Sequence, residues 1–149
     1  MDKKNILIVD DDETIMKNLK VILQTEGYSV DTARMGREAI EKSTTKFYNL
    51  ALLDIKLPDM EGTKLLTSLH EPLPLMMKIM ITGFPSLENA VEAVNLGADA
   101  YLIKPVRPDD LLKVVREKLK EQEELEKMTG EKIANWVQSR IRKPISPKT

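Results

Sequence analysis

The stretch Ile6-Leu-Ile-Val-Asp-Asp-Asp12 places four consecutive aliphatic side chains directly before three acids. An unbroken aliphatic run of this length predicts a strand that is buried on both faces of a parallel sheet. Short apolar runs over residues 50–53, 79–81 and 100–103 also end at polar side chains. Those side chains are Asp54, Thr82 and Lys104. The polar residues at the strand ends therefore indicate both the fold and the chemistry to be expected.

Longer amphipathic segments separate the apolar runs and predict helices. Strands are expected at residues 5–10, 28–33, 49–54, 77–82 and 100–103. Helices are expected at residues 13–26, 36–46, 62–70, 86–96 and from 108 onward. Alternating strands and helices favour a parallel sheet that is covered on both faces through right-handed crossovers. We therefore expect an α/β, flavodoxin-like (βα)5 doubly wound sheet in the order 2-1-3-4-5, with the more polar second strand at an edge.

The composition fits one ordinary cytoplasmic domain with an appendage. The chain has 149 residues, is 42% hydrophobic and 32% charged, and carries a net charge of −1, so no global field favours nucleic acid or membrane. The lack of cysteine excludes disulfides and thiolate zinc sites. No apolar run approaches the ~20 residues of a membrane span, and no signal peptide is apparent. We expect a domain over residues 1–121 and, over 122–149, an extended C-terminal helix with a disordered basic tail from Pro144.

Asp10, Asp11 and Asp54 are expected at one edge of the sheet, because ligands of such folds bind at the carboxyl ends of the strands. Three carboxylates so close together repel one another unless a cation joins them. Hard oxygen ligands favour Mg²⁺ or Mn²⁺, with Asp11 and Asp54 as direct ligands and Asp10 acting through water or behind them. Asp54 could then attack phosphorus, while Lys104 and Thr82 stabilise the phosphoryl oxygens. No strong general base is apparent, so we expect slow hydrolysis.

Four segments, in order along the chain, closely resemble the receiver domains of two-component response regulators. The segments are Ile6–Asp12, Leu52–Pro58, Met80–Gly83 and Tyr101–Pro105. The resemblance, which covers residues 5 to about 120, implies phosphotransfer from a sensor histidine kinase to Asp54. It also implies Mg²⁺ bound in part by the backbone carbonyl of Lys56. Thr82 and Tyr101 would pass the signal to the face formed by the fourth helix, fifth strand and fifth helix.

The resemblance further implies a cis Lys104–Pro105 peptide bond. Glu61-Gly62 departs from the Asp-Gly that is common in the family, and Lys56 and Phe84 occupy positions that, in the family, tune dephosphorylation. The lifetime of the phosphate therefore stays open. The protein is expected to be a signalling module rather than an enzyme, with a sensor histidine kinase and a downstream protein as partners.

Other interpretations of the same residues were weighed. A phosphatase of the haloacid-dehalogenase type carries a second acid two residues after its aspartate nucleophile, but Lys56 stands in that place after Asp54. A flavin or nucleotide carrier would need a glycine-rich phosphate loop, which the sequence lacks. Asp10 and Asp11 alone would be solvated acids of a first helical turn. His70, the only histidine, fits a surface or helix-end residue beside a proline loop.

The C-terminal segment 131–143 carries four apolar residues at helical spacing among basic ones. They are Ile133, Trp136, Val137 and Ile141. Apolar stripes are usually buried, so packing on the domain or on a second copy is favoured. A membrane surface or nucleic acid as the partner stays open, although DNA binding and a membrane span are not expected. Dimerisation through this helix, or through the face of the fourth helix, fifth strand and fifth helix, is also left open.

Overall fold

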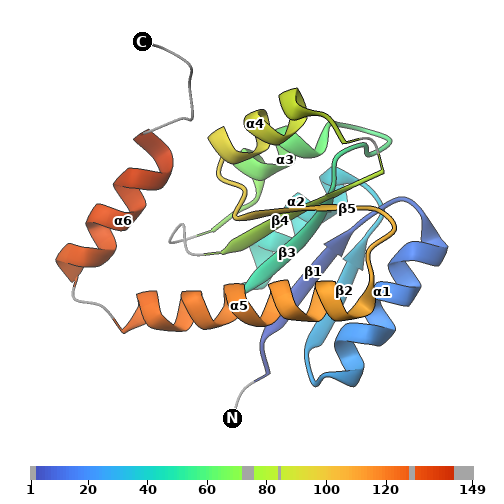
Figure 1. Ribbon diagram of the computed structural model, residues 1–149, viewed down its shortest axis with the longest axis horizontal. Coiled ribbons are helices and arrows are strands. Elements are labelled where there is room, and N and C mark those ends of the chain that lie inside the picture. The colour runs from blue at the N-terminus through green and yellow to red at the C-terminus, as the bar shows by residue number, and fades with distance from the viewer. Residues whose placement is uncertain (1–2, 72–75, 84, 128–129, 143–149) are drawn as a thin grey trace.

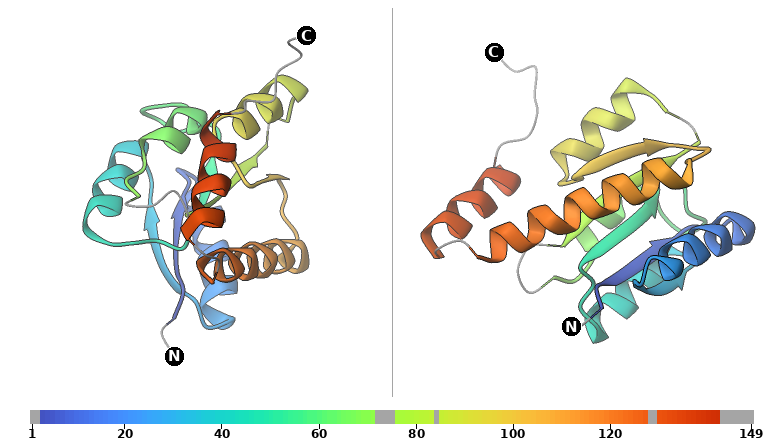
Figure 2. Two further views of the ribbon diagram at one scale, coloured as in Figure 1. Left: turned by 90° about the vertical axis from the view of Figure 1, so that its left-hand side faces the viewer. Right: turned by 60° about the horizontal axis from the view of Figure 1, so that its bottom comes forward.

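The computed structural model describes residues 3–71, 76–83, 85–127 and 130–142. In these residues, five parallel strands form one sheet in the order β2-β1-β3-β4-β5 (Figures 1 and 2). The strands are β1 (Asn5–Val9), β2 (Ser29–Ala33), β3 (Leu50–Asp54), β4 (Met77–Thr82) and β5 (Ala100–Ile103). The helices are α1 (Glu13–Thr25), α2 (Gly36–Thr45), α3 (Gly62–Ser68), α4 (Leu87–Asn95), α5 (Pro108–Glu126) and α6 (Gly130–Arg142). The expected fold class and strand order are confirmed, with β2 at an edge.

Two hydrophobic cores lie on opposite faces of the sheet, because successive strand residues point to opposite sides. Ile6 and Ile8 of β1 pack with side chains from α1 and α5. Leu7 and Val9 pack on the other face, with side chains from α2, α3 and α4. Every residue of β3 and β4 is buried, as expected of strands that are covered on both faces.

Local sequence signals fix several helix ends. Asp12 caps α1 and Ser86 caps α4, each with a side-chain oxygen that accepts the backbone N–H three residues further on, at 3.1 and 3.0 Å. Gly27 and Gly97 follow α1 and α4 with φ angles of +98° and +102°, in the left-handed region that favours glycine. These signals explain why the observed elements agree with the expected ones within a residue or two.

The last turns of α5 are held against the sheet. Gln122 is fully buried, with its Nε2 donating to the carbonyl oxygen of Asn49 at 2.8 Å and its Oε1 accepting from the Asn49 side chain at 3.1 Å. Leu125, one turn later, is also buried in the core beneath α1 and α5. α5 therefore continues as a packed helix to Glu126.

α6 stands between the end of α5 and the end of α4 (Figures 1 and 2). Trp136, Val137 and Arg140 are half-buried on its inward side, whereas Ile141 is 69% exposed. The expected apolar stripe is thus wrong at Ile141, because Arg140, one turn after Trp136, takes the inward position. The tail from Pro144, expected to be disordered, lies outside the described residues.

Candidate functional site

β1 and β3 are neighbours in the sheet, and both lead into acids at their carboxyl ends. Val9 pairs with Leu53, so Asp10 and Asp54, the next residues, lie side by side. β2 lies on the far side of β1, so the chain reverses its winding direction between β1 and β3. Such a reversal leaves a crevice at the strand ends in doubly wound folds.

Asp10, Asp11 and Asp54 form one cluster, in which one oxygen of each lies within 4.8 Å of the others. Asp10 and Asp54 are buried, whereas Asp11 is exposed. The Asp12 N–H donates to Asp10 Oδ1 at 2.9 Å, and the Lys56 N–H donates to Asp54 Oδ1 at 3.4 Å. Backbone donors therefore orient the two buried carboxylates, while Asp11 faces solvent.

Lys104 supplies a positive charge to this cluster. Its Nζ lies 2.9 Å from Asp10 Oδ2 and 3.3 Å from Asp54 Oδ2. Burial alone would lower the pKa of Lys104, but hydrogen bonds and charge from the two carboxylates raise it above its ordinary value. The Lys104–Pro105 peptide bond that follows is cis.

Asp54 is held in an environment that disfavours its negative charge. Burial raises the pKa of Asp54, and the neighbouring charge of Asp10 raises it further. The Lys104 ammonium and the Lys56 N–H act in the opposite direction without cancelling the increase. An added cation would relieve this repulsion, since two buried carboxylates share a single lysine.

Gly62 allows the chain to pass close to Asp54, a feature that the sequence reasoning missed. A Cβ at Gly62 would lie 2.1 Å from the Asp54 carbonyl oxygen. The Gly62 N–H donates to the Ile55 carbonyl oxygen at 2.6 Å, which ties the start of α3 to the end of β3. The Glu61-Gly62 pair is visible in the sequence, but its tertiary contact is not.

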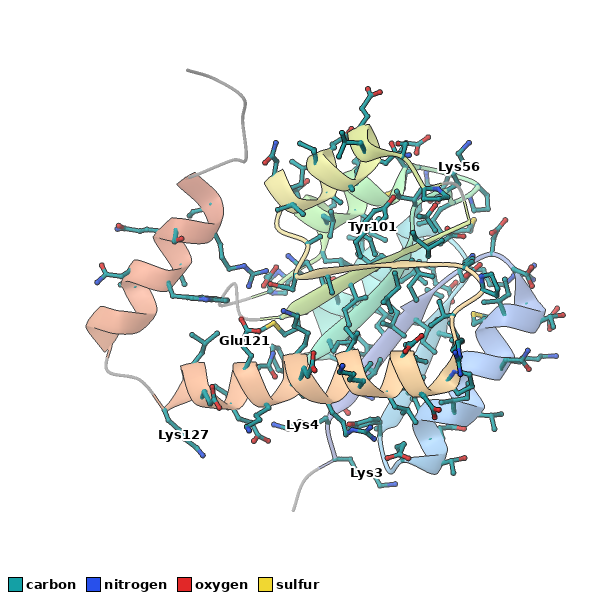
Figure 3. All side chains as sticks on the ribbon, in the orientation of Figure 1. Lys3, Lys4, Lys56, Tyr101, Glu121 and Lys127 are labelled. Atoms are coloured by element: carbon teal, nitrogen blue, oxygen red, sulfur yellow. The ribbon has the colours of Figure 1, made fainter. Side chains whose placement is uncertain are left out.

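Thr82 and Tyr101 lie on β4 and β5, the two strands that follow β3 in the sheet order. Thr82 ends β4 and is fully buried, and its carbonyl oxygen accepts the Lys104 N–H at 2.8 Å. Tyr101 lies on β5 beneath α4 (Figure 3), and its ring packs on the core shared with α2 and α3. Its hydroxyl is buried and, within the described residues, has no hydrogen-bond partner. Lys56 lies beyond the end of β3, where its backbone forms an isolated antiparallel β-bridge with that of Glu61.

The cluster provides the ligand atoms that a hard divalent cation prefers. Its donors are carboxylate oxygens from two adjacent strand ends, with no imidazole or thiolate in the group. Mg²⁺ is usually held by one or two carboxylates and keeps several waters, which suits a cluster that is open on the Asp11 side. Mn²⁺ fits the same oxygen set.

The sheet order and the acid cluster define a receiver-type α/β module. The chain belongs to the response regulator receiver domain family, whose model matches residues 6–116. It is therefore a receiver of the two-component phosphorelay systems. In the described part of the chain, no helix is long and apolar enough to cross a membrane.

Curated relatives are longer than this chain. The transcriptional regulatory protein ZraR of Escherichia coli K12 is 36% identical over 110 residues, which are 74% of this chain and 25% of that protein. The uncharacterized transcriptional regulatory protein YkoG of Bacillus subtilis is 34% identical over 121 residues, 81% of this chain and 53% of that protein. The chain thus spans between a quarter and about half of these relatives.

Solved structures of similar length share the fold. A CheY-like receiver domain protein from Methanospirillum hungatei is 55% identical with a TM-score of 0.79, covering 83% of this chain and 98% of that one. A Burkholderia pseudomallei response regulator with a phosphorylated aspartic acid, calcium ion and citrate is 30% identical with a TM-score of 0.72. That match covers 84% of this chain and 74% of the other.

Proposed function

We propose that Asp54 accepts a phosphoryl group from the phosphohistidine of a sensor histidine kinase. An Asp54 carboxylate oxygen bonds to phosphorus as the bond between phosphorus and the kinase imidazole nitrogen breaks. The observation that carries this proposal is the cluster itself, with three carboxylate oxygens within 4.8 Å and Lys104 against two of the acids. The phosphorylated aspartic acid in the related Burkholderia pseudomallei structure supports it.

Asp11, Asp54 and the backbone carbonyl of Lys56 would hold Mg²⁺, with Asp10 acting through water or behind them. When bound, the cation neutralises charge on the phosphoryl oxygens. Mn²⁺ would serve the same role, because the donors are oxygens. The raised pKa of Asp54 supports this arrangement, since the metal-free site carries more negative charge than Lys104 alone offsets.

Lys104 and Thr82 would stabilise the transferred group. The Lys104 ammonium already touches Asp54, so it meets a phosphoryl group on that carboxylate with little movement. Thr82 would supply a hydroxyl from the adjacent strand end. Lys56 stands where a phosphatase would carry its second acid, so we infer a stored phosphoryl group and slow hydrolysis.

The signal would leave the site through Thr82 and Tyr101 toward the face formed by α4, β5 and α5. A buried hydroxyl without a partner costs about 1–3 kcal/mol. The Tyr101 hydroxyl is in that situation among the described residues, which favours a second ring position once the site changes. We propose that this movement presents the face to a downstream protein, or to a second copy of the chain, in the cytoplasm.

Phosphorylation with acetyl phosphate and Mg²⁺, followed by intact-mass measurement and peptide mapping, tests the proposal. We expect one added phosphoryl group on wild type, none on Asp54→Asn, and a higher Mg²⁺ requirement for Asp11→Asn. Asp12→Asn is the matched control, because asparagine also caps helices and Asp12 lies outside the cluster. Modification of the Asp54→Asn variant to the wild-type extent would exclude Asp54 as the acceptor.

A further inference from the structure

α6 is fastened to the connection between α4 and β5 through Arg140. One guanidinium nitrogen, Nη2, donates to the Gly97 carbonyl oxygen at 2.9 Å and lies 3.0 Å from Asp99 Oδ2. The Arg140 and Asp99 side chains are 14% and 12% exposed, so the ion pair is largely shielded from solvent. The guanidinium also lies 4.6 Å from the centre of the Trp136 ring, within cation–π distance.

Asp99 joins this helix to the sheet. Its Oδ2 accepts the Lys78 N–H of β4 at 2.8 Å as well as the Arg140 hydrogen bond. Its own N–H donates to the Lys78 carbonyl oxygen at 2.7 Å. β4 and β5 begin at this point and lead to Thr82 and Lys104 at the opposite edge. α6 therefore holds the amino ends of the two strands whose carboxyl ends reach the candidate site.

α4 has few anchors of its own. Ala93 is its only buried residue, and Leu87 is 81% exposed. The end of α4 leads directly to Gly97, the carbonyl of which is bound by Arg140. Because α6 follows α5 and stands beside α4 (Figure 2), it restricts how far this end of α4 can move relative to α5.

The described apolar side chains of α6 are only partly covered by the domain. Trp136 and Val137 are only half-buried, and Ile141 is exposed. A cleft of about 370 Å³ lies between α6 and the α3–α4 side, lined by residues that include Leu66 and Leu96. Among the α6 side chains that the structure describes, residues 134–141, the docking contacts are a shielded ion pair and half-buried apolar side chains, an arrangement typical of segments that open locally.

We propose that α6 is a releasable strut between α5 and the α4–β5 connection, and that phosphorylation of Asp54 favours its release. This inference rests on the proposed function. A phosphoryl group on Asp54 would interact with Thr82 and Lys104 at the carboxyl ends of β4 and β5, while α6 restrains the amino ends of the same strands. Coupling between two equilibria is reciprocal, so loss of docking must favour the phosphorylated state by the same factor.

Trp136 reports on docking directly, because it is the only tryptophan in the chain and lies under Arg140. We expect Arg140→Gln to raise the acrylamide quenching constant of Trp136 by about twofold and to speed hydrogen exchange in α6. The quenching constant of Arg140→Lys should lie between those of wild type and Arg140→Gln. Arg116→Gln is the control, since Arg116 pairs with Glu26 on the exposed surface of α5. If Arg140→Gln shows the same Trp136 quenching and the same hydrogen exchange in α6 as wild type, the proposal that Arg140 holds α6 in place is wrong.

Beryllofluoride with Mg²⁺ tests the coupling. We expect it to move the Trp136 quenching of wild type toward that of Arg140→Gln, and we expect Arg140→Gln to bind beryllofluoride about fivefold more tightly. Binding that leaves both Trp136 and the affinity of Arg140→Gln unchanged would overturn the coupling, while the proposed function would stand. Absence of beryllofluoride binding, together with no phosphoryl group on Asp54, would overturn the proposed function and the coupling together.

Discussion

Asp54 destabilises the fold that contains it. Burial and the charge of Asp10 raise its pKa, so the folded state favours the protonated acid. The corresponding contribution to stability is full at acidic pH and is lost as the pH rises through the raised pKa of the folded state. At neutral pH the ionised carboxylate is therefore a cost, which Lys104 offsets only in part.

We predict that Asp54→Asn increases the free energy of unfolding at pH 7, without divalent metal, by on the order of 1 kcal/mol. The gain should shrink as the pH is lowered through the raised pKa of Asp54, because the carboxylate then becomes protonated in the folded state. Urea denaturation at several pH values measures it, with Asp12→Asn as the exposed control. Saturating Mg²⁺ should stabilise wild type more than Asp54→Asn, because the variant loses a ligand. A variant less stable than wild type at pH 7 would contradict this account.

Gly62 and Gly83 form a natural pair for testing how closely the chain approaches Asp54. A Cβ at Gly62 would meet three backbone atoms of residues 54–55 at 2.1–2.9 Å, whereas one at Gly83 would meet, among the described residues, only Lys104 Cδ, at 3.9 Å. We predict that Gly62→Ala lowers stability by about 2–3 kcal/mol and weakens Mg²⁺ binding. Gly83→Ala should stay within about 0.5 kcal/mol of wild type. Thermal unfolding with and without Mg²⁺ distinguishes the two, and equal effects would refute the steric argument.

Gln122 makes the end of α5 part of the folded domain. Its side chain exchanges two hydrogen bonds with Asn49 in a fully buried position. We predict that Gln122→Leu lowers the free energy of unfolding by about 1–3 kcal/mol, because it removes two hydrogen bonds to Asn49 that are made at a buried position. Glu124→Leu, an exposed position on the same helix, should change it by less than about 0.5 kcal/mol. Equal losses in denaturant titrations would contradict the prediction.

β1, β3, β4 and β5 could be predicted from sequence because each is a short, mainly apolar run, whereas β2 was indicated by its alternation of polar and apolar residues. The helix that lies between Ser86 and Gly97, α4, could be predicted equally well, since capping signals are local. The acid cluster could be predicted from one rule, that the carboxyl ends of parallel strands lie together on the same side of the sheet. The structure brings Asp10, Asp11 and Asp54 together and places Lys104 among them.

Contacts between distant segments could not be predicted in this way. Asp59 binds the N–H groups of Gly36 and Arg37 at the start of α2, at 2.8 and 2.9 Å, although no local capping residue is present there. The Arg140–Asp99 pair spans 41 positions. Neither contact has a local pattern, because each depends on how whole elements pack.

Across the whole molecule, stability should be graded from the central strands outward. β1, β3 and β4 are buried almost throughout, whereas α4 buries one residue and α6 packs through a few half-buried side chains. We predict that amides of the three central strands exchange only by global unfolding and that those of α4 and α6 exchange by local opening. Hydrogen exchange at increasing denaturant concentration measures this. Exchange in α6 that follows the global denaturant dependence would contradict it.

The edge of the sheet at β2 has a consequence for solubility. An edge strand exposes backbone groups with which another chain can pair, and lysines near the edge oppose that pairing. Lys42 Nζ donates to the carbonyl oxygen of Thr32, next to the Ala33 carbonyl that faces inward to Asp10. Lys46 and Tyr48 bind the Asp31 carboxylate on the same strand. A backbone acceptor on the open side of β2 is therefore bound by the chain's own lysine, and a contact of this kind opposes edge-to-edge pairing of folded molecules.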